Sequence, residues 1–309
     1  MDYCSPTSVK KDGGCFSRNS LINLVKAWNE TYTANKIKYN TKTTNKELWN
    51  LLNKKMTPIC KEGNDWCWPS ALKEISKKPQ VKKVVNQIAE KELRPEKPEE
   101  WLENPKEWLS NFDIENVMKQ YNDNPEFNYY FIGVFPIDFS VIDGFGKCLY
   151  SEFCNLQIKK YINKGIKYIG LITNLDKHDQ PGSHWTSTFI VIDPKLKSYG
   201  AYYYDSTART VPKYVVDFLK GIKTQADLLY PNKTFSVYYN KKQHQKKNTE
   251  CGVFSIIFQL RWIHKLQKNK DTMFPDIIND DRINDDNMNK IRDSLYRPNI
   301  KSVLKLKNG

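Results

Sequence analysis

The chain has 309 residues, of which 39% are hydrophobic and 13% aromatic, so it can bury a sizeable core and is not disordered. Its 49 lysines and arginines outnumber its 35 aspartates and glutamates, and the net charge of +14 draws such a protein to polyanions. No apolar run approaches the roughly 18–20 residues that span a bilayer, and Met1 to Cys4 show no signal-peptide pattern, so we expect no membrane span.

The N-terminal third is predicted to be helical, because apolar residues recur at helical spacing within residues 17–78. They include Leu21, Ile22, Leu24, Val25, Trp28, Leu48, Trp49, Leu51 and Leu52. Residues 91–106 are charged and hold three prolines, which is typical of a linker. We therefore predict an N-terminal helical arm over residues 1–105 that ends in this linker, and a second domain over residues 106–309.

The second domain alternates predicted helices and strands. The predicted helices are residues 113–121, residues 211–229, a run that begins near Cys251, and residues 285–296. The predicted strands are residues 168–172, 185–193, 199–205 and 235–239. This order favours an α+β fold, with a small mixed sheet flanked by helices and a cysteine at a helix N-terminus.

Seven cysteines are irregularly spaced, and their odd number predicts reduced thiols in place of a disulfide framework. Cys4, Cys15, Cys60 and Cys67 cluster in the N-terminal third. The gaps within the two pairs, ten and six residues, match no familiar zinc-ligand spacing. We therefore expect neither a metal site nor a cofactor.

The most informative residues surround Cys251. This cysteine opens an apolar helical run, where backbone N–H groups and the helix dipole favour a thiolate, the reactive form of the side chain. Gly252 permits close approach of a substrate backbone. His184 closes a polar loop ahead of a predicted strand, and its ring can take the thiol proton. A nucleophile and a base of this kind predict a cysteine hydrolase.

Three sequence blocks together carry a family resemblance. They are Gly182-Ser183-His184-Trp185, Tyr204-Asp205-Ser206, and Gln245 six residues ahead of Cys251-Gly252. The pattern resembles the adenain-like and SUMO-protease superfamily of cysteine proteases, and is most similar to the polyprotein-processing proteases of African swine fever virus and other large DNA viruses. The order His, acid, Gln, Cys is that of this group. The resemblance covers roughly residues 106–297. The block around His184 and the block around Cys251 together are a specific signal, whereas either one alone would be a weak signal.

The resemblance implies a role for each site residue. Cys251 would be the nucleophile and His184 the base, while Asp205 would orient the imidazole, a role that asparagine can fill in related viral enzymes. Gln245 would donate its amide to the oxyanion, beside the backbone N–H of Cys251. The alternatives in the sequence are His178, His244 and His264 for the base, Asp193 for the acid, and Gln243 for the oxyanion donor.

Trp108 and Trp185 resemble an aromatic pair that flattens the substrate channel in the SUMO-protease branch. Two indole faces exclude any side chain from between them, so only a Gly-Gly backbone passes. The alternative for both is an ordinary core tryptophan. Gly13-Gly14-Cys15 in the chain itself offers a sequence for slow self-cleavage, unless that segment is folded.

The resemblance therefore implies a viral cysteine endopeptidase that cleaves after Gly-Gly-type sites in structural polyprotein or core protein precursors during virion maturation. Its expected location is the virion and the host cytoplasm. One alternative is an isopeptidase that removes a ubiquitin-like modifier, and more distant ones are an acetyltransferase and a basic nucleic-acid-binding scaffold. Lys241, Lys242, Lys246 and Lys247 could give non-specific nucleic-acid contact, although a solvated, Lys- and Asn-rich surface explains them more simply.

Overall fold

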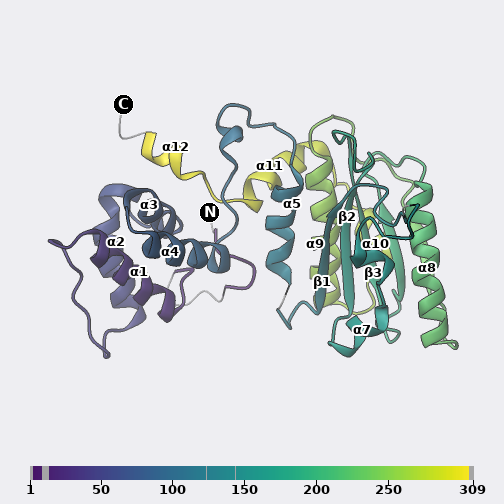
Figure 1. The fold of residues 1–309 in the computed structure, drawn as a ribbon, viewed down its shortest axis with the longest axis horizontal. Coiled ribbons are helices and arrows are strands. Elements are labelled where there is room, and N and C mark those ends of the chain that lie inside the picture. Colours follow the sequence, from purple (N-terminus) through teal and green to yellow (C-terminus); the bar gives the residue numbers. More distant parts are fainter. Residues whose placement is uncertain (1–2, 9–13, 123, 143, 306–309) are drawn as a thin grey trace. The chain divides into compact units, whose positions relative to one another are not determined.

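The computed structural model describes residues 3–8, 14–122, 124–142 and 144–305. It divides into two compact units, one of Met1–Glu107 with Asp293–Gly309 and the other of Trp108–Arg292 (Figure 1). The first break lies two residues beyond the boundary predicted at residue 105. The predicted second domain, residues 106–309, differs at its end, since the last segment belongs to the first unit. In the Gly13-Gly14 sequence, Gly13 lies outside the described residues.

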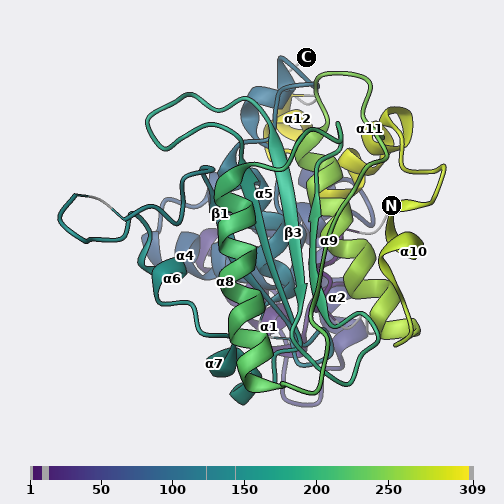
Figure 2. The same ribbon diagram turned by 90° about the vertical axis from the view of Figure 1, so that its right-hand side faces the viewer.

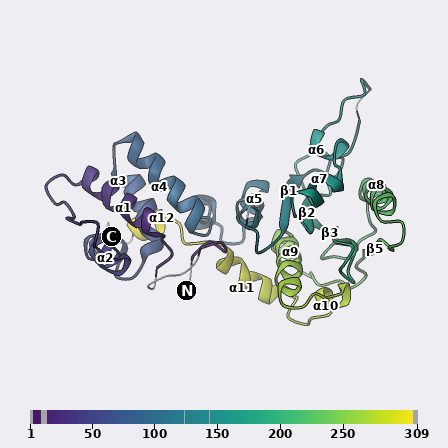
Figure 3. The same cartoon turned by 90° about the horizontal axis from the view of Figure 1, so that it is seen from below.

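The first unit is a helical cluster around its own core. Its helices are α1 (Arg18–Thr31), α2 (Asn45–Cys60), η1 (Asp65–Cys67), α3 (Trp68–Ile75), α4 (Pro79–Glu92), η2 (Glu99–Leu102) and α12 (Ile300–Lys305). Leu24, Leu52 and Trp68 are fully buried, and Ile300 of α12 belongs to the same core. Figure 3 shows α12 beside the helices of this unit. The helices predicted within residues 17–78 are therefore present, and α4 was not predicted.

Residues 91–106 are not a free linker, which corrects the interpretation from their composition. Trp101 is buried and packs edge-on against Tyr296, with ring centroids 4.9 Å apart. The Arg297 guanidinium donates to a Glu96 carboxylate oxygen at 2.9 Å, and the Lys97 N–H donates to the Arg297 carbonyl at 2.9 Å. The prolines and charges suggested flexibility, but the C-terminal segment supplies this stretch with partners that no local pattern reveals.

The prediction of reduced cysteines without disulfides is wrong for six of the seven. The structure pairs Cys4 with Cys15, Cys60 with Cys67, and Cys148 with Cys154, each across 11 residues or fewer. Among the described residues Cys251 is the free cysteine. An odd number of cysteines means only that at least one of them is unpaired within the chain. Here that residue is Cys251, the predicted nucleophile. Within the described part of the chain no group of three or more potential metal ligands gathers.

The second unit is built on a mixed sheet, which confirms the α+β fold class. Its described strands are β1 (Tyr129–Phe135), β2 (Tyr168–Asn174), β3 (Trp185–Val191), β4 (Gly200–Tyr204) and β5 (Ser236–Tyr239), in that spatial order. The pairs β2–β3 and β3–β4 are antiparallel, whereas β1–β2 and β4–β5 are parallel. Every residue of β2 is buried, as expected for a strand covered on both faces.

The remaining elements of this unit are helical. They are α5 (Asn111–Met118), η3 (Lys119–Tyr121), α6 (Ser151–Cys154), α7 (Ile158–Asn163), α8 (Lys213–Leu229), α9 (Cys251–Lys268), α10 (Phe274–Ile278) and α11 (Asp285–Leu295), the last of which crosses into the first unit. Figure 2 shows the sheet between α8 and α9. None of the helices in the described residues is long and apolar enough to cross a membrane.

A buried glutamine fixes α9 on its face of the sheet. The Gln259 side-chain amide donates to the Ser187 hydroxyl at 2.7 Å and to the Thr188 carbonyl at 2.8 Å, and its oxygen accepts from the Tyr129 hydroxyl at 3.0 Å. A side chain at Gly170 would collide with this arrangement, since an added Cβ would lie 2.0 Å from that hydroxyl oxygen. These bonds set where the first residue of α9, Cys251, stands relative to β3.

Candidate active site

Strand pairing brings His184 next to Asp205. β3 begins at Trp185, directly after His184, and β4 ends at Tyr204, directly before Asp205. Ser187 of β3 pairs with Tyr204 of β4 in the antiparallel register. Because antiparallel neighbours run in opposite directions, the start of one strand lies beside the end of the other. The two polar residues that flank these strands therefore meet at one edge of the sheet.

His184 and Asp205 form a buried hydrogen-bonded pair. The imidazole Nε2 donates to Asp205 Oδ1 at 2.7 Å, and the side chains are 5% and 1% exposed. The same carboxylate oxygen accepts from the Thr207 N–H at 2.8 Å and from the Thr207 hydroxyl at 2.7 Å. Asn240, which follows β5, accepts from the Asp205 N–H at 2.9 Å and donates to its carbonyl at 2.7 Å. The carboxylate is thus fixed in side chain and backbone.

Cys251 completes the cluster from α9. Its side chain is buried, it carries no disulfide, and it lies close enough to the His184 imidazole to raise the pKa of that ring. Because Asp205 occupies Nε2, Nδ1 is the ring nitrogen left to face the thiol. The first helical bond of α9 runs from the Phe254 N–H to the Glu250 carbonyl. Cys251 therefore lies among the N–H groups that have no partner within the helix, where a negative charge is favoured.

The electrostatics of the cluster favour an imidazolium ion. Burial alone lowers the pKa of His184, but hydrogen bonds with Asp205 and Cys251 outweigh it and raise that pKa to about 9. Burial acts to raise the pKa of Asp205, whereas the hydrogen bonds from His184 and Thr207 lower it further than burial raises it. His184 is therefore protonated and Asp205 ionised at neutral pH, as needed beside a thiolate.

This raised pKa predicts the alkaline side of the pH profile. The imidazolium proton is present below pH 9 and is lost as pH rises through about 9, so kcat/KM should fall there. On the acid side, protonation of the thiolate–imidazolium pair should also reduce kcat/KM, which gives a bell-shaped curve. The measurement is kcat/KM on a peptide substrate from about pH 4 to about pH 10. A curve that rises through pH 9 and then stays level contradicts the pairing of His184 with Cys251.

Asp205→Asn supplies the control for that profile. The amide oxygen still accepts from the imidazole, so partial activity should remain, but loss of the negative charge should move the alkaline limb to lower pH. Asp205→Ala should lose more activity. An unmoved alkaline limb in Asp205→Asn would mean that the carboxylate does not hold the imidazolium proton.

Gln245 lies beside Ser206, next to the catalytic acid candidate. It is 3% exposed, its side-chain oxygen accepts from the Ser206 hydroxyl at 2.6 Å, and its amide nitrogen donates to the Lys247 carbonyl at 2.6 Å. Gln243, the alternative in the sequence, is exposed and donates to the Gln245 carbonyl at 2.9 Å. The structure therefore gives Gln245 the fixed side chain that an oxyanion donor needs, while Gln243 supports its backbone.

The other histidines have different partners. The His178 imidazole is half exposed and hydrogen-bonds to Asp138 at 2.6 Å. That bond is the main cause of its raised pKa. His244 is buried, accepts from the Tyr204 hydroxyl at 2.9 Å and donates to the Ile278 carbonyl at 3.0 Å. Burial lowers the pKa of His244, so it is a neutral structural residue. His264 is exposed on α9. Asp193, the fallback for the acid, lies 3.7 Å from the Lys167 ammonium.

Trp185 is tied to the segment that holds Trp108. The Trp185 indole N–H donates to the Leu109 carbonyl at 2.9 Å. Leu109 also covers the start of α9, since a Cβ added to Gly252 would lie 3.0 Å from its side chain. Trp108 is 43% exposed and Trp185 partly exposed, so neither is a fully buried core residue. The two tryptophans thus belong to segments that meet beside Cys251, and their role as a gate stays a prediction.

Two residues that hold this site were not found in the sequence. Asn240 fixes the backbone of Asp205, and Asp285 accepts from the backbone of the loop that carries Gln245. For Asn240 a signal existed, because polar residues at the carboxyl ends of neighbouring parallel strands, here β4 and β5, lie at one sheet edge. Asp285 opens a predicted polar helix and gave no comparable signal.

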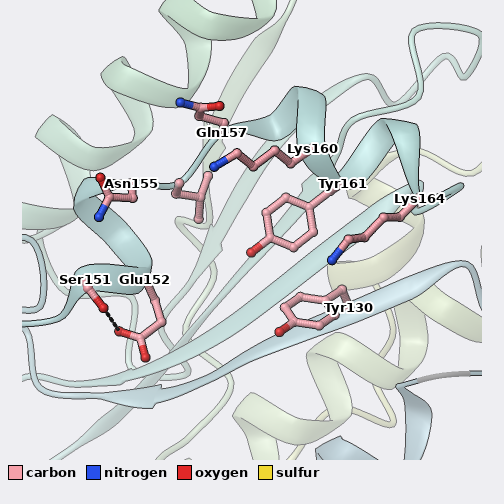
Figure 4. A pocket seen from close by; sticks show the side chains of 9 residues that line it. Tyr130, Ser151, Glu152, Asn155, Gln157, Lys160, Tyr161 and Lys164 are labelled. Carbon is pink, nitrogen blue, oxygen red and sulfur yellow. Dashed lines mark hydrogen bonds between the residues drawn. The ribbon is translucent and has the colours of Figure 1, made fainter.

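A separate hollow of about 320 Å³ lies near β1, α6 and α7 (Figure 4). It is lined by Tyr130, Ser151, Glu152, Asn155, Leu156, Gln157, Lys160, Tyr161 and Lys164. None of these is a predicted site residue, and Figure 4 shows ammonium, phenol, amide and carboxylate groups around it. Its Ser151 hydroxyl donates to the neighbouring Glu152 carboxylate at 3.4 Å, but both residues are exposed, unlike the buried Cys251, His184 and Asp205.

Comparison with known proteins agrees with this geometry. The putative thiol protease R355 of Acanthamoeba polyphaga mimivirus is 29% identical over 292 residues, which cover 85% of each protein. A cysteine protease of African swine fever virus is 25% identical over 139 residues, 45% of this chain and 47% of the relative. The crystal structure of the African swine fever virus protease superposes with a TM-score of 0.63 at 19% identity, covers 96% of each chain, and shows the common fold. No protein-family model matches the chain.

Proposed function

We propose a substrate class for this chain, which is a cysteine protease of the viral group that includes the African swine fever virus enzyme. It cleaves after Gly-Gly-type sites in viral structural polyprotein or core protein precursors during virion maturation, in the virion and the host cytoplasm. The observation that carries the proposal is the free, buried Cys251 at the start of α9, which raises the pKa of a His184 that Asp205 holds at 2.7 Å.

The geometry supports a two-step acyl transfer. The Cys251 thiolate attacks the scissile carbonyl carbon, and the His184 imidazolium gives its proton to the leaving amine, which leaves a thioester on Cys251. A water molecule then attacks the thioester while His184 takes a proton from it, and the carboxylic product departs. Gln245 and the Cys251 N–H stabilise the oxyanion in both steps. Asp205 keeps the imidazole in the tautomer that these transfers need.

The residues beside Cys251 support the proposed preference for Gly-Gly. Trp185 is held against the Leu109 carbonyl, and Leu109 packs on Gly252, so two segments border the position of the scissile bond. If Trp108 and Trp185 close the channel above it, a residue with a side chain cannot pass. A hydrophobic site discriminates one methylene by roughly 10- to 200-fold, so a valine in place of the second glycine should cost at least that much.

Cleavage of matched fluorogenic peptides tests this specificity. A Gly-Gly-X peptide should be cut at least about tenfold faster than its Gly-Val-X counterpart. Trp185→Ala should relax that preference as well as lower the rate, whereas Trp185→Phe, which keeps a flat ring, should retain the preference. Equal cleavage of both peptides by wild type and by Trp185→Ala would contradict the proposed tryptophan gate and the proposed Gly-Gly specificity. Cleavage confined to folded ubiquitin-like modifier fusions would instead favour the isopeptidase.

The basic loop before Cys251 gives weaker support for a nucleic-acid partner. The Lys247 ammonium lies 2.9 Å from Asp286, and that of Lys242 lies 3.6 Å from Asp281. These ion pairs offset part of the positive charge of the loop. We therefore propose only a non-specific, salt-dependent contact with nucleic acid, which depends on the net positive charge of the chain.

A further inference from the structure

We propose that Asp285 is a positioning residue for the oxyanion donor, an inference that rests on the proposed function. Residues 240–250 connect β5 to α9 and carry Gln245, yet they form no helix or strand. Their backbone N–H groups therefore need partners outside regular structure. The Ser206 carbonyl accepts from the His244 and Gln245 N–H groups, and Asp285, the first residue of α11, accepts from those of Lys246 and Lys247.

Asp285 is linked to Gln245, the proposed oxyanion donor, through the backbone of Lys247. Its two carboxylate oxygens accept from the Lys246 N–H at 2.9 Å and from the Lys247 N–H at 3.2 Å. The Lys247 carbonyl in turn accepts from the Gln245 amide at 2.6 Å. Asp285 is 7% exposed, so these bonds are shielded from water. Fixing the Lys246–Lys247 backbone thus fixes the rotamer of Gln245.

The Gln245 amide is left able to bind an oxyanion. A side-chain amide nitrogen carries two hydrogens, and in the described structure the Lys247 carbonyl takes one of them. The Ser206 hydroxyl donates to the amide oxygen at 2.6 Å, and a flipped amide would set that oxygen against the Lys247 carbonyl oxygen, where no hydrogen bond can form. The second hydrogen is then presented in a single direction, which is the preorganisation that oxyanion stabilisation requires.

The same face of α11 holds the other end of the loop. Arg292 lies seven residues after Asp285, two helical turns along, and therefore on the same side of the helix. Its guanidinium lies 3.5 Å from Glu250, the residue before Cys251, and both side chains are buried. Figure 2 shows α11 beside the start of α9. One helix face thus fixes the loop near Gln245 and again next to the nucleophile.

Asp286 provides a matched control. It occupies the next position in the first turn of α11 and carries the same charge, but it is 78% exposed and binds the Lys247 ammonium at 2.9 Å instead of the backbone. Asp285→Ala and Asp286→Ala remove equal charge from the same helix N-terminus. Removing Arg292 is a poorer test, because one unpaired member of a buried ion pair destabilises the whole fold.

The test is a double-mutant cycle in kcat on a Gly-Gly peptide. Gln245→Ala should lower kcat by about 10²–10³ with little change in KM. Asp285→Ala should lower kcat by roughly 10- to 100-fold, as expected for a displaced catalytic group, and Asp285→Glu should recover part of it. Asp286→Ala should stay within about twofold. In the Gln245→Ala background Asp285→Ala should cost almost nothing, because both act through one donor.

Two further measurements separate positioning from general damage. Alkylation of Cys251 by iodoacetamide displaces iodide at a saturated carbon and forms no oxyanion, so Asp285→Ala should alkylate at the wild-type rate. Hydrogen exchange of residues 240–250 should become at least about tenfold faster in Asp285→Ala than in Asp286→Ala. Unchanged exchange, additive kcat losses, or equal losses in both aspartate variants would overturn the role of Asp285. If wild type cleaves only modifier fusions, the proposed substrate fails, and the cycle on that fusion still decides the role of Asp285.

Discussion

Cys251→Ala should reduce peptidase turnover by on the order of 10⁶-fold, since loss of the nucleophile removes the covalent route and leaves only binding and the oxyanion site. The fold should survive, because the change removes one buried sulfur atom at the first residue of α9. The measurements are kcat on a Gly-Gly peptide and the midpoint of thermal unfolding. Both are taken at the pH of maximal wild-type activity.

Ser255→Ala is a suitable control for the change at Cys251. Ser255 lies one turn further along α9 and is equally buried, and in the described residues its side chain makes no hydrogen bond to a predicted site residue. It should keep turnover within a few-fold of wild type. If Cys251→Ala retained turnover while another single cysteine variant lost it, the nucleophile would have to be reassigned.

His184→Ala should lower kcat by at least about 10⁴-fold, because neither the thiolate nor the leaving amine then has a proton partner. The loss should be accompanied by slower alkylation of Cys251, because removal of the imidazolium takes away the positive charge that stabilises the thiolate. If the midpoint of thermal unfolding stays close to that of wild type, the loss of activity is caused by loss of the His184–Cys251 pair and not by unfolding.

The chain offers a second Asp–His pair as the comparison. His178 binds Asp138 at 2.6 Å, much as His184 binds Asp205 at 2.7 Å, but it is half exposed and is not hydrogen-bonded to Cys251. His178→Ala should therefore leave turnover within a few-fold of wild type. Comparable losses in the two variants would mean that the base is not His184 alone, and that the loop before β3 takes part.

The site was predictable from the sequence where polar residues interrupt apolar runs. His184 stands directly before β3, Asp205 directly after β4, and Cys251 at the start of α9, so each is marked by the hydrophobic pattern beside it. The spacing of Gln245 from Cys251 was informative because both lie on one short connection. Strand pairing then brings His184 and Asp205 together without any further signal.

What the sequence did not reveal depends on contacts between distant segments. Asn240 reaches Asp205 across 35 residues and Asp285 reaches Lys246 across 39, and neither distance leaves a local pattern. The odd number of cysteines suggests reduced thiols, although one free cysteine, Cys251, accounts for it. β1 was missed because its sequence, Tyr-Tyr-Phe-Ile-Gly-Val-Phe, is apolar apart from one glycine and shows no alternation, although the burial of its first five residues alternates.

The most direct test is alkylation under non-reducing conditions, followed by mapping of the modified residue. The described disulfides protect the other cysteines, so iodoacetamide should modify Cys251 alone. Peptidase activity should fall in proportion to that single modification, and a Gly-Gly peptide added in excess should slow both. Full modification of Cys251 with undiminished cleavage, or loss of cleavage with Cys251 unmodified, would contradict its assignment as the nucleophile.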